Sequence, residues 1–443
     1  MKKKLRAVLC SLCTLVFFTG CNFHKIQATI LTEPAKTTPL SYSEAHSDEE
    51  LNAFREKAEG FAAKFADKVY AKQTGKDNYV VSPVSVFMGL SLAAECSAGE
   101  TKNQILSALD LSTSELQGQI SKLYRQLNKT HERMDYGLLG EKSKKTGEIK
   151  LSNSIWISEA ARVKSSALDV LSKKYFCHAY AVDFLKENDQ ANRDIESFLR
   201  RETNDLIDVS LDLDDTTVFA LINTLYLKDV WNSLGKDIDR TDKKYIFTET
   251  GGETEAQSFL QGKYIQGKPY EGKTFTSFHV STLNSYRIQF ILPKDGYTAD
   301  EIFTVENIVE AKNCDYTWID DENKIKYYTR SLFPEFSAAF DGKVETVLQE
   351  SFGIEDLFHA KLCDMSALSD EPLYCTEVRH ITKLKVDRKG IEGAAVTITP
   401  GAGAPGPDEC EKVYLDFVVD RGFGFVLTDT HGTTLFSGII HSV

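Results

Sequence analysis

Long apolar segments recur from residue 51 almost to the end of the chain, and they constrain the fold more than any other feature. The apolar runs that follow the first segment have strand character and cover residues 155–157, 218–227, 288–292, 423–427 and 434–440. No change in composition and no internal repeat divides residues 50–443. The sequence therefore predicts one large α+β domain over residues 50–443. It begins with a helix whose apolar residues recur at helical spacing: Leu51, Phe54, Ala58, Phe61, Phe65 and Val69.

The N-terminus has the pattern of a secretory signal. Basic residues between positions 2 and 6 precede an apolar run over residues 7–18, which is too short to span a bilayer as a stable helix. The following Thr19-Gly20-Cys21 resembles the bacterial lipobox, where the signal is cut before a cysteine that receives lipid. We therefore expect residues 1–20 to be a lipoprotein signal peptide. Lipid on Cys21 would anchor the protein outside the cytoplasm, on a bacterial membrane or cell surface.

Residues 21–49 mix polar and apolar residues without a period and contain Pro34 and Pro39. This composition favours a polar tether between the lipid and the domain. The 443 residues carry a formal net charge of −13, and removing residues 1–20, with four basic and no acidic side chains, changes it to −17. Because an acidic surface repels polyanions, we expect no nucleic-acid partner.

Cysteine spacing gives no redox or metal motif. Cys10 and Cys13 lie in the signal and Cys21 at the lipid position. The other six are widely spaced, with neither a C-x-x-C pair nor a zinc pattern, so we assign no disulfide and expect no metal and no cofactor. These six are Cys96, Cys177, Cys314, Cys363, Cys375 and Cys410.

Enzyme motifs are weak. There is no G-x-S-x-G, and His131-Glu132 lacks the second histidine of a zinc protease helix. Residues 401–406 do spell G-x-G-x-x-G after a strand-like segment, but prolines surround the glycines and no amphipathic helix follows, as a dinucleotide site requires. We therefore do not expect an enzyme.

The segment KGIEGAAVTITPGAGAPGPDEC, residues 389–410, changes character halfway along. Its first half has small and β-branched residues that suit a strand. Its second half is rich in Gly, Ala and Pro, which hardly support regular structure, and it reads as an exposed loop. A strand-forming segment placed directly before such a loop needs an explanation.

Several motifs resemble the serpin family, in the family's order. Residues 78–85 (NYVVSPVS) and 99–105 (GETKNQI) resemble its helix B to helix D region, and residues 221–228 (LINTLYLK) with Trp231 resemble strand 3A and the breach. The match continues through FILP, FPEF, residues 348–358 and the C-terminal residues 423–425 and 436–438. It covers essentially residues 50–443, so the chain is identified as a member of this family.

The resemblance implies the serpin fold: three β-sheets with sheet A central, about nine helices, and an exposed reactive-centre loop at about residues 388–413. Trp231 matches the breach. Hydroxyl, amide and imidazole groups can exchange hydrogen-bond partners when a sheet parts around a new strand. Such residues form the shutter under the middle of sheet A, matched here by Ser82, Ser85, Asn223 and His380.

Gly390 matches the hinge glycine that precedes the loop. The resemblance implies inhibition of a serine-type endopeptidase, as a monomer, by a suicide mechanism. The protease cleaves the loop and forms an acyl-enzyme, and the cut loop inserts into sheet A as a central strand and traps it. Because strand residues alternate between faces, the inward side chains would be Ile391, Gly393, Ala395 and Thr397, and the outward ones Glu392, Ala394 and Val396.

The hinge departs from the usual inhibitory pattern. Arg388 stands where Glu is usual, Ile391 where a small hydroxyl residue is usual, and Val396 ends the run of small residues. Pro400 would fall within the inserted strand, where it removes a ladder hydrogen bond. A non-inhibitory, substrate-like serpin on the cell surface therefore remains an alternative.

The reactive bond has two candidate positions. Counting forward from Gly390 gives Ala404-Pro405, and counting back from Phe423 gives Glu411-Lys412. Proline is a poor residue directly after a cut, so Ala402 or Ala404 would suit a protease that accepts small residues. Cys410 raises the further alternative of a papain-like cysteine protease as the target.

Overall fold

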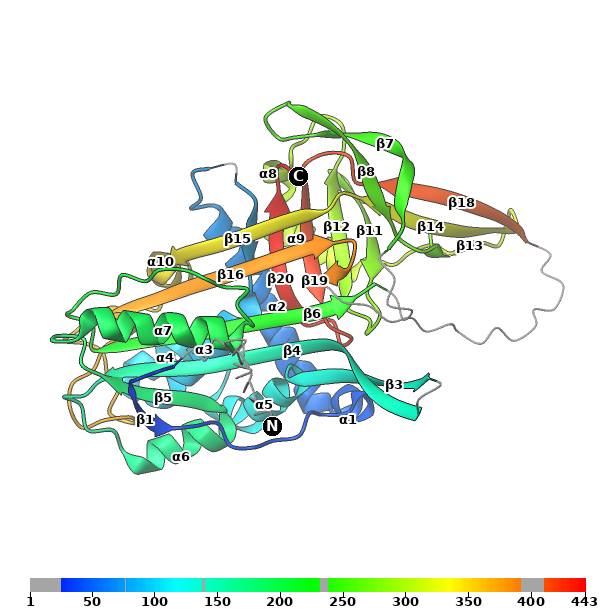
Figure 1. The fold of residues 1–443 in the computed structure, drawn as a ribbon. Coiled ribbons are helices and arrows are strands. Elements are labelled where there is room, and N and C mark those ends of the chain that lie inside the picture. Colours follow the sequence, from blue (N-terminus) through cyan, green and yellow to red (C-terminus); the bar gives the residue numbers. More distant parts are fainter. Residues whose placement is uncertain (1–24, 76, 138–139, 232–237, 392–409) are drawn as a thin grey trace, which may run out of the picture.

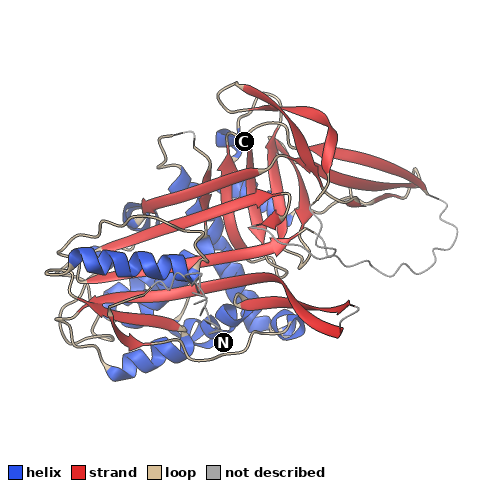
Figure 2. Ribbon diagram, in the orientation of Figure 1, coloured by secondary structure: helices blue, strands red, loops and turns tan. Residues whose placement is uncertain are grey.

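The computed structural model describes residues 25–75, 77–137, 140–231, 238–391 and 410–443. In these residues the chain forms an α+β fold with three sheets, as predicted (Figure 2). Ten α-helices are described, where the sequence suggested about nine. They are α1 Tyr42–Ser47, α2 Glu49–Tyr70, α3 Pro83–Cys96, α4 Gly99–Ala108, α5 Thr113–Gln126, α6 Ser165–Lys174, α7 Asn188–Glu202, α8 Ala299–Ile302, α9 Val305–Asn313 and α10 Glu345–Phe352.

Helices α2 and α3 form the centre of the helical layer. Helix α2 begins where the Asp48 side chain accepts a hydrogen bond from Leu51 N (3.0 Å), which satisfies one free N–H of the first turn. Helix α3 begins with Pro83, which suits the first helical position, and nearly all of its side chains are buried. The Phe87 ring of α3 packs edge-on against Phe54 of α2. No helix of the described residues is long and apolar enough to cross a membrane.

Sheet A is the largest sheet, with the strand order β1-β5-β4-β6-β17-β16-β15 and with β3 paired to β4 (Figure 1). β6 and β4 are antiparallel, and so are β16 and β15. The strands are β1 Thr29–Thr32, β3 Lys129–Gly137, β4 Gly140–Ser158, β5 Cys177–Val182, β6 Phe219–Val230, β15 Phe336–Lys343, β16 Glu377–Asp387 and β17 Gly390–Ile391.

Sheet B is the buried sheet, with the order β10-β11-β12-β19-β20-β2. Sheet C has the order β13-β14-β8-β7, and β9 and β18 also pair with β14. The strands of sheet B are β2 Tyr79–Val81, β10 Tyr270–Glu271, β11 Phe275–Ser281, β12 Arg287–Pro293, β19 Phe423–Thr428 and β20 Thr434–Ile440. Those of sheet C are β7 Arg240–Thr248, β8 Thr254–Gln261, β9 Ile265–Gln266, β13 Ile319–Asp320, β14 Ile325–Phe333 and β18 Glu411–Val418.

The two faces of sheet A pack against different partners. Inward side chains such as Leu225 of β6 and Leu384 of β16 join the main core with α3 and sheet B. On the outer face, α7 lies over the sheet (Figure 1) and buries a second apolar cluster that includes Phe198, Ile222 and Ile381. The middle of sheet A is therefore covered on both sides, as a central strand pair requires.

Part of the predicted tether lies on the domain. β1 pairs antiparallel with β5 and so extends sheet A beyond it. The Asp194 side chain of α7 accepts hydrogen bonds from Gln27 N (3.0 Å) and Ala28 N (2.6 Å). α1, also within residues 21–49, precedes α2 directly. The segment thus differs from a free tether, because β1 satisfies the backbone groups of an otherwise open sheet edge.

We expect Asp194→Ala to lower the free energy of unfolding by about 1–3 kcal/mol, because it removes the buried acceptor of two backbone N–H groups. Urea unfolding measures the loss, and hydrogen exchange of residues 27–32 should become faster. Arg193→Ala, at an exposed position of the same helix, is the control and should change little. Equal stability of both variants would show that Asp194 does not hold this segment.

Candidate functional site

The hinge predicted at Gly390 lies in the middle of sheet A, where β17 stands between β6 and β16. β17 is antiparallel to both neighbours and pairs with the end of each. Its register pairs are Gly390↔Val230 and Ile391↔Asp229 with β6, and Gly390↔Asp387 and Ile391↔Val386 with β16. The two residues of β17 therefore begin a strand between β6 and β16.

Beyond the two residues of β17, no described strand stands between β6 and β16. They pair directly only at the opposite end, through Glu377↔Ala220 and Val378↔Leu221. Between these contacts, residues 222–228 of β6 and 379–385 of β16 pair neither with each other nor with another described residue on their facing sides. Both strands keep their outer partners, β4 and β15. We call this gap in an otherwise paired sheet the slot.

Gly390 is required by the close approach of two backbones. A Cβ atom at this position would lie 2.0 Å from the carbonyl oxygen of Asp229, and the φ angle of Gly390 is +153°. Both conditions exclude other residues. The next side chain, Ile391, is fully buried in the main core. An isoleucine at this position therefore fits between the two strands without displacing them.

Three side chains hold the turn between β16 and β17. The Trp231 ring donates from Nε1 to the carbonyl oxygen of Asp387 (2.6 Å). Glu335 accepts a hydrogen bond from Arg388 N (2.9 Å), and the Asp387 side chain accepts one from Lys389 N (2.8 Å). Trp231, the predicted breach residue, thus fixes the upper end of the slot. Glu335 lies in the FPEF motif, and no sequence pattern predicts its contact with Arg388.

Asp229 of β6 is a buried carboxylate at the same end that the sequence did not single out. It accepts hydrogen bonds from the Thr282 hydroxyl, from Asn284 N (3.1 Å) and from Asn284 Nδ2 (2.6 Å). Burial raises the pKa of Asp229 to about 6 from 3.8. The folded protein thus holds this proton more tightly than the unfolded chain, and the stability from protonation is lost as the pH rises from about 4 to 6. An acidic residue inside an apolar strand was the available signal.

The predicted shutter residues border the slot in two groups. In the first, Ser82 N donates to Nε2 of His380 (3.0 Å), and the Ser85 hydroxyl donates to the carbonyl oxygen of Ser82 (2.9 Å). Burial lowers the pKa of His380 to about 3, so the imidazole stays neutral and can accept this bond. The buried Ser82 hydroxyl has no hydrogen-bond partner among the described residues.

The second group contains Asn223, which does not bond to His380. Its amide donates to Oδ1 of Asn153 on β4 (2.6 Å). A cavity of about 10 Å³ separates the two groups and is lined by both Asn223 and His380. Gly89 of α3 approaches closely from below, since a Cβ there would lie 2.8 Å from the Asn223 side-chain oxygen. The middle of the slot is therefore lined by neutral polar groups on both sides.

Some of the candidate loop residues belong to the described part of the chain, and others do not. Glu411 and Lys412 lie in β18, opposite Ile325 and Lys326 of β14. Glu411 N also donates to the carbonyl oxygen of Lys324 (2.8 Å), so this end of the loop is fixed to sheet C. The following predicted residues lie outside the described residues: Cys21, Glu392, Gly393, Ala394, Ala395, Val396, Thr397, Ala402, Ala404 and Pro405.

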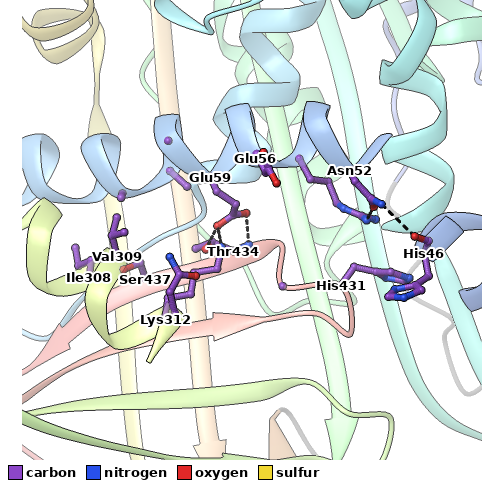
Figure 3. Close-up of a pocket in the computed structure, with 16 residues that line it drawn as sticks. His46, Asn52, Glu56, Glu59, Ile308, Val309, Lys312, His431, Thr434 and Ser437 are labelled. Atoms are coloured by element: carbon purple, nitrogen blue, oxygen red, sulfur yellow. Dashed lines mark hydrogen bonds and ion pairs between the residues drawn. The ribbon is translucent and has the colours of Figure 1, made fainter. Parts of the chain in front are cut away.

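A cavity of about 770 Å³ lies between α2, α9 and the turn before β20 (Figure 3). Charged side chains in its wall are paired. Glu59 accepts a hydrogen bond from Thr434 N (2.7 Å) and forms an ion pair with Lys312. The Ser437 hydroxyl donates to the carbonyl oxygen of Phe425, not to a histidine. None of the lining residues belongs to β6, β16 or β17. Of the two histidines that line it, His431 has its Nδ1 within hydrogen-bond distance of the Thr430 hydroxyl (3.2 Å).

The described residues contain no group of three His, Cys, Asp or Glu side chains placed to hold a metal ion. The six widely spaced cysteines, Cys410 included, are free thiols. Burial raises the pKa of Cys96 and Cys375, which makes both thiols poor nucleophiles.

Comparison with known proteins gives consistent matches along the chain. Putative serpin-Z6C of Oryza sativa subsp. japonica is 24% identical over 394 residues, which cover 83% of this chain and 91% of that protein. Alpha-1-antiproteinase 2 of Equus caballus is 24% identical over 367 residues, covering 81% and 82%. The crystal structure of tengpin, a thermophilic serpin in the native state, superposes with a TM-score of 0.72 at 22% identity and covers 94% of this chain and all of that one.

The family model described as serpin (serine protease inhibitor) matches residues 56–443. This range includes the three sheets except β1, together with the slot, the hinge and the loop. The relatives are matched over most of their own length, so the agreement concerns the whole domain. The chain therefore belongs to the serpin family, which is described as a family of serine protease inhibitors.

Proposed function

We propose that this protein inhibits a serine-type endopeptidase by inserting its cleaved loop into the slot of sheet A. One observation carries the proposal: β17 already begins a strand between β6 and β16, and the slot continues below it. No catalytic residue of this chain is needed, because the protease supplies the nucleophile and becomes trapped as an acyl-enzyme. The structure of tengpin, similar in fold, was determined in the native state.

We infer the path of the inserted loop from the register of β17. If the pairing continued, residues 392–398 would lie opposite residues 222–228 of β6 and 379–385 of β16. This is the full length of the slot. Each backbone hydrogen bond formed there would add a net ~1 kcal/mol of stability. Insertion therefore releases free energy that the uncleaved loop, joined at both ends, cannot release.

The same register explains the small side chains. Residues opposite each other in an antiparallel pair share a face, so Ala395 would lie beside Leu225 and Thr382 on the core face. Gly393 and Thr397 share that face with the already buried Ile391. A small residue fits in a packed core, where a charged one would not.

Thr397 would reach the shutter. Its register position lies opposite Asn223 on one side and His380 on the other. A threonine hydroxyl both donates and accepts, so it can bond to an amide and a neutral imidazole at once. The outward Glu392 would lie between Lys228 and Lys385, an opposite-charge arrangement that favours strand pairing.

The departures from the usual hinge are compatible with this reading. Ile391 stands fully buried in the sheet. Pro400 falls opposite Glu377 and Ala220, beyond the slot and at the contact where β6 and β16 already pair. The ladder hydrogen bond that proline cannot make would thus be lost only at the lower end of the new strand. Full insertion requires that contact to part.

We place the reactive bond within residues 402–405. A protease binds its substrate as an exposed extended segment, whereas Glu411-Lys412 lies in β18 with its backbone paired to β14. The small residues Ala402 and Ala404 suit an elastase-like or subtilisin-like specificity. A papain-like target and a non-inhibitory, substrate-like role are distinguished by the experiments below.

We further propose that lipid on Cys21 anchors the mature chain to a bacterial membrane or cell surface, outside the cytoplasm. The support is the sequence Thr19-Gly20-Cys21 after the basic and apolar signal. An inhibitor at that surface would meet extracellular proteases before they reach the cell envelope.

Inhibition predicts a covalent complex. Residues 22–443 mixed with elastase-like, subtilisin-like, trypsin-like and papain-like proteases should form, with at least one of the serine proteases, a band that survives SDS and boiling. Mass spectrometry of the released C-terminal peptide should place the cut within residues 402–405. A complex with the papain-like enzyme alone would change the target class. If every active protease cleaves the loop and turns over, the substrate-like role holds.

Insertion predicts a contrast between neighbouring loop residues. Ala395→Arg should abolish the complex and turn the protein into a substrate, because an unpaired guanidinium would have to enter the core. Ala394→Arg, facing outward between Lys383 and Tyr226, should retain more of the inhibition, because its guanidinium stays off the core face. A difference of ~1.4 kcal/mol changes the ratio of complex to turnover tenfold.

The melting temperature after cleavage provides the second readout of this contrast. It should rise for the wild type and for Ala394→Arg, since a new strand fills the slot, and should stay unchanged for Ala395→Arg. Equal loss of inhibition in both variants would exclude a strand with alternating faces.

The proposed anchor predicts that the wild-type protein, expressed in bacteria with its signal, takes up labelled fatty acid and partitions with membranes. Cys21→Ser should lose both properties, because the sulfur that carries the lipid is absent. Cys314→Ser, within the domain, is the matched control and should keep both. Full labelling of the Cys21→Ser form would rule out lipidation at this residue.

A further inference from the structure

Three tyrosines form an exposed cluster on sheet C, which we call the tyrosine patch: Tyr264, Tyr328 and Tyr414. The rings of Tyr328 and Tyr414 are stacked, with centroids 5.4 Å apart. The Tyr264 ring meets Tyr414 edge-on at 5.1 Å. Tyr414 is 58% exposed and Tyr264 41% exposed. A contiguous group of exposed aromatic rings is a feature of interaction sites.

The strand register places the Tyr328 and Tyr414 rings on the same, solvent-facing side of sheet C. Tyr328 of β14 lies directly opposite Tyr414 of β18, and two residues further along Arg330 lies opposite Asp416. The alternate residues of β18 turn the other way, and Phe417 packs toward Phe278 of sheet B. Sheet C therefore buries one face and presents the tyrosine patch on the other.

The patch is held in place before any partner arrives. Arg330 donates to both oxygens of Asp416 (2.7 and 3.3 Å) and to Gln261 (2.7 Å). The same guanidinium lies over the Tyr264 ring, 5.0 Å from its centre, and the Tyr264 hydroxyl donates to Asp416 (3.3 Å). Fixed rings lose little conformational entropy on binding, which is a property of interaction hot spots.

The position of the patch indicates its partner. β18 begins at Glu411, and Tyr414 is only three residues further along the strand that continues the reactive loop. A bond cut at Ala404 lies seven residues before Glu411, at most ~25 Å away in extended chain. A globular protease of ~200 residues has a radius of gyration of about 16 Å. A protease bound to the loop would therefore extend over sheet C.

The size of a protease–inhibitor interface also indicates that a bound protease would contact sheet C. Such interfaces use about 20–30 residues on each side. The whole segment 392–409 has 18 residues, and a protease cleft contacts only part of it. Residues outside the loop must supply the remaining contact, and the nearest exposed aromatic group in sequence is the tyrosine patch.

We infer that the tyrosine patch is a second docking surface for the target protease. It follows the cut in sequence, so it would meet the protease surface beyond the subsites that hold residues after the scissile bond. The complementary groups there would be apolar or guanidinium side chains, which stack on tyrosine faces. This inference rests on the proposed function, because it concerns the same protease.

The test measures the second-order rate constant for formation of the SDS-stable complex with the protease of the panel above that reacts fastest. Tyr414→Ala and Tyr264→Ala together should lower the rate constant at least tenfold, while the ratio of complex to turnover and the melting temperature stay unchanged. Phenylalanine at both positions should restore most of the rate, because the stacking remains. Tyr297→Ala, a tyrosine of matched exposure (43%) outside sheet C, is the control.

The outcomes separate this inference from the proposed function. If no complex forms but the loop is cleaved, the inhibitor proposal fails, and kcat/KM for cleavage of the intact protein still measures the patch. If the double alanine variant forms the complex at the wild-type rate with every protease that reacts, the patch is not a docking surface, and the inhibitor proposal is unaffected. A dimer in size-exclusion chromatography that Tyr414→Ala dissociates would overturn it too, since the patch would then join two copies of this chain.

Discussion

The structure of sheet A depends on the contact between two backbones at Gly390. Because a side chain there would collide with the carbonyl oxygen of Asp229, only glycine allows β17 to stand between β6 and β16. That contact sets the register of every residue that follows in the loop. It also explains why the turn before it is held by Trp231 and Glu335, since any slip would move the side chains to the wrong face.

The polar groups along the slot suit a sheet that must open and close again. His380 is neutral, Asn223 bonds to Asn153 of the neighbouring strand, and the Ser82 hydroxyl has no partner among the described residues. Neutral groups can change partners at low cost, whereas a buried charge would need its counter-charge in both states. The buried carboxylate of Asp229 stands at the hinge end, where its partners Thr282 and Asn284 come from the turn between β11 and β12.

The sequence and the structure agree on the domain and differ at its margins. The apolar periods and the ordered motifs predicted the fold class, and the family match over residues 56–443 confirms it. Residues 21–49 were expected to be a tether because they lack a period, but a four-residue edge strand such as β1 needs none. The contact of Gln27 and Ala28 with Asp194 joins residues far apart in the chain and could not be read from composition.

By itself, the sequence determined where a strand could form and which residues would share a face, because these depend on local periodicity and side-chain size. It could not place Asp229 beside Asn284, separate Asn223 from His380, or gather Tyr264, Tyr328 and Tyr414 on one surface. Those arrangements depend on which strands become neighbours. Strand pairing joins residues that are distant in sequence, so only the tertiary structure decides them.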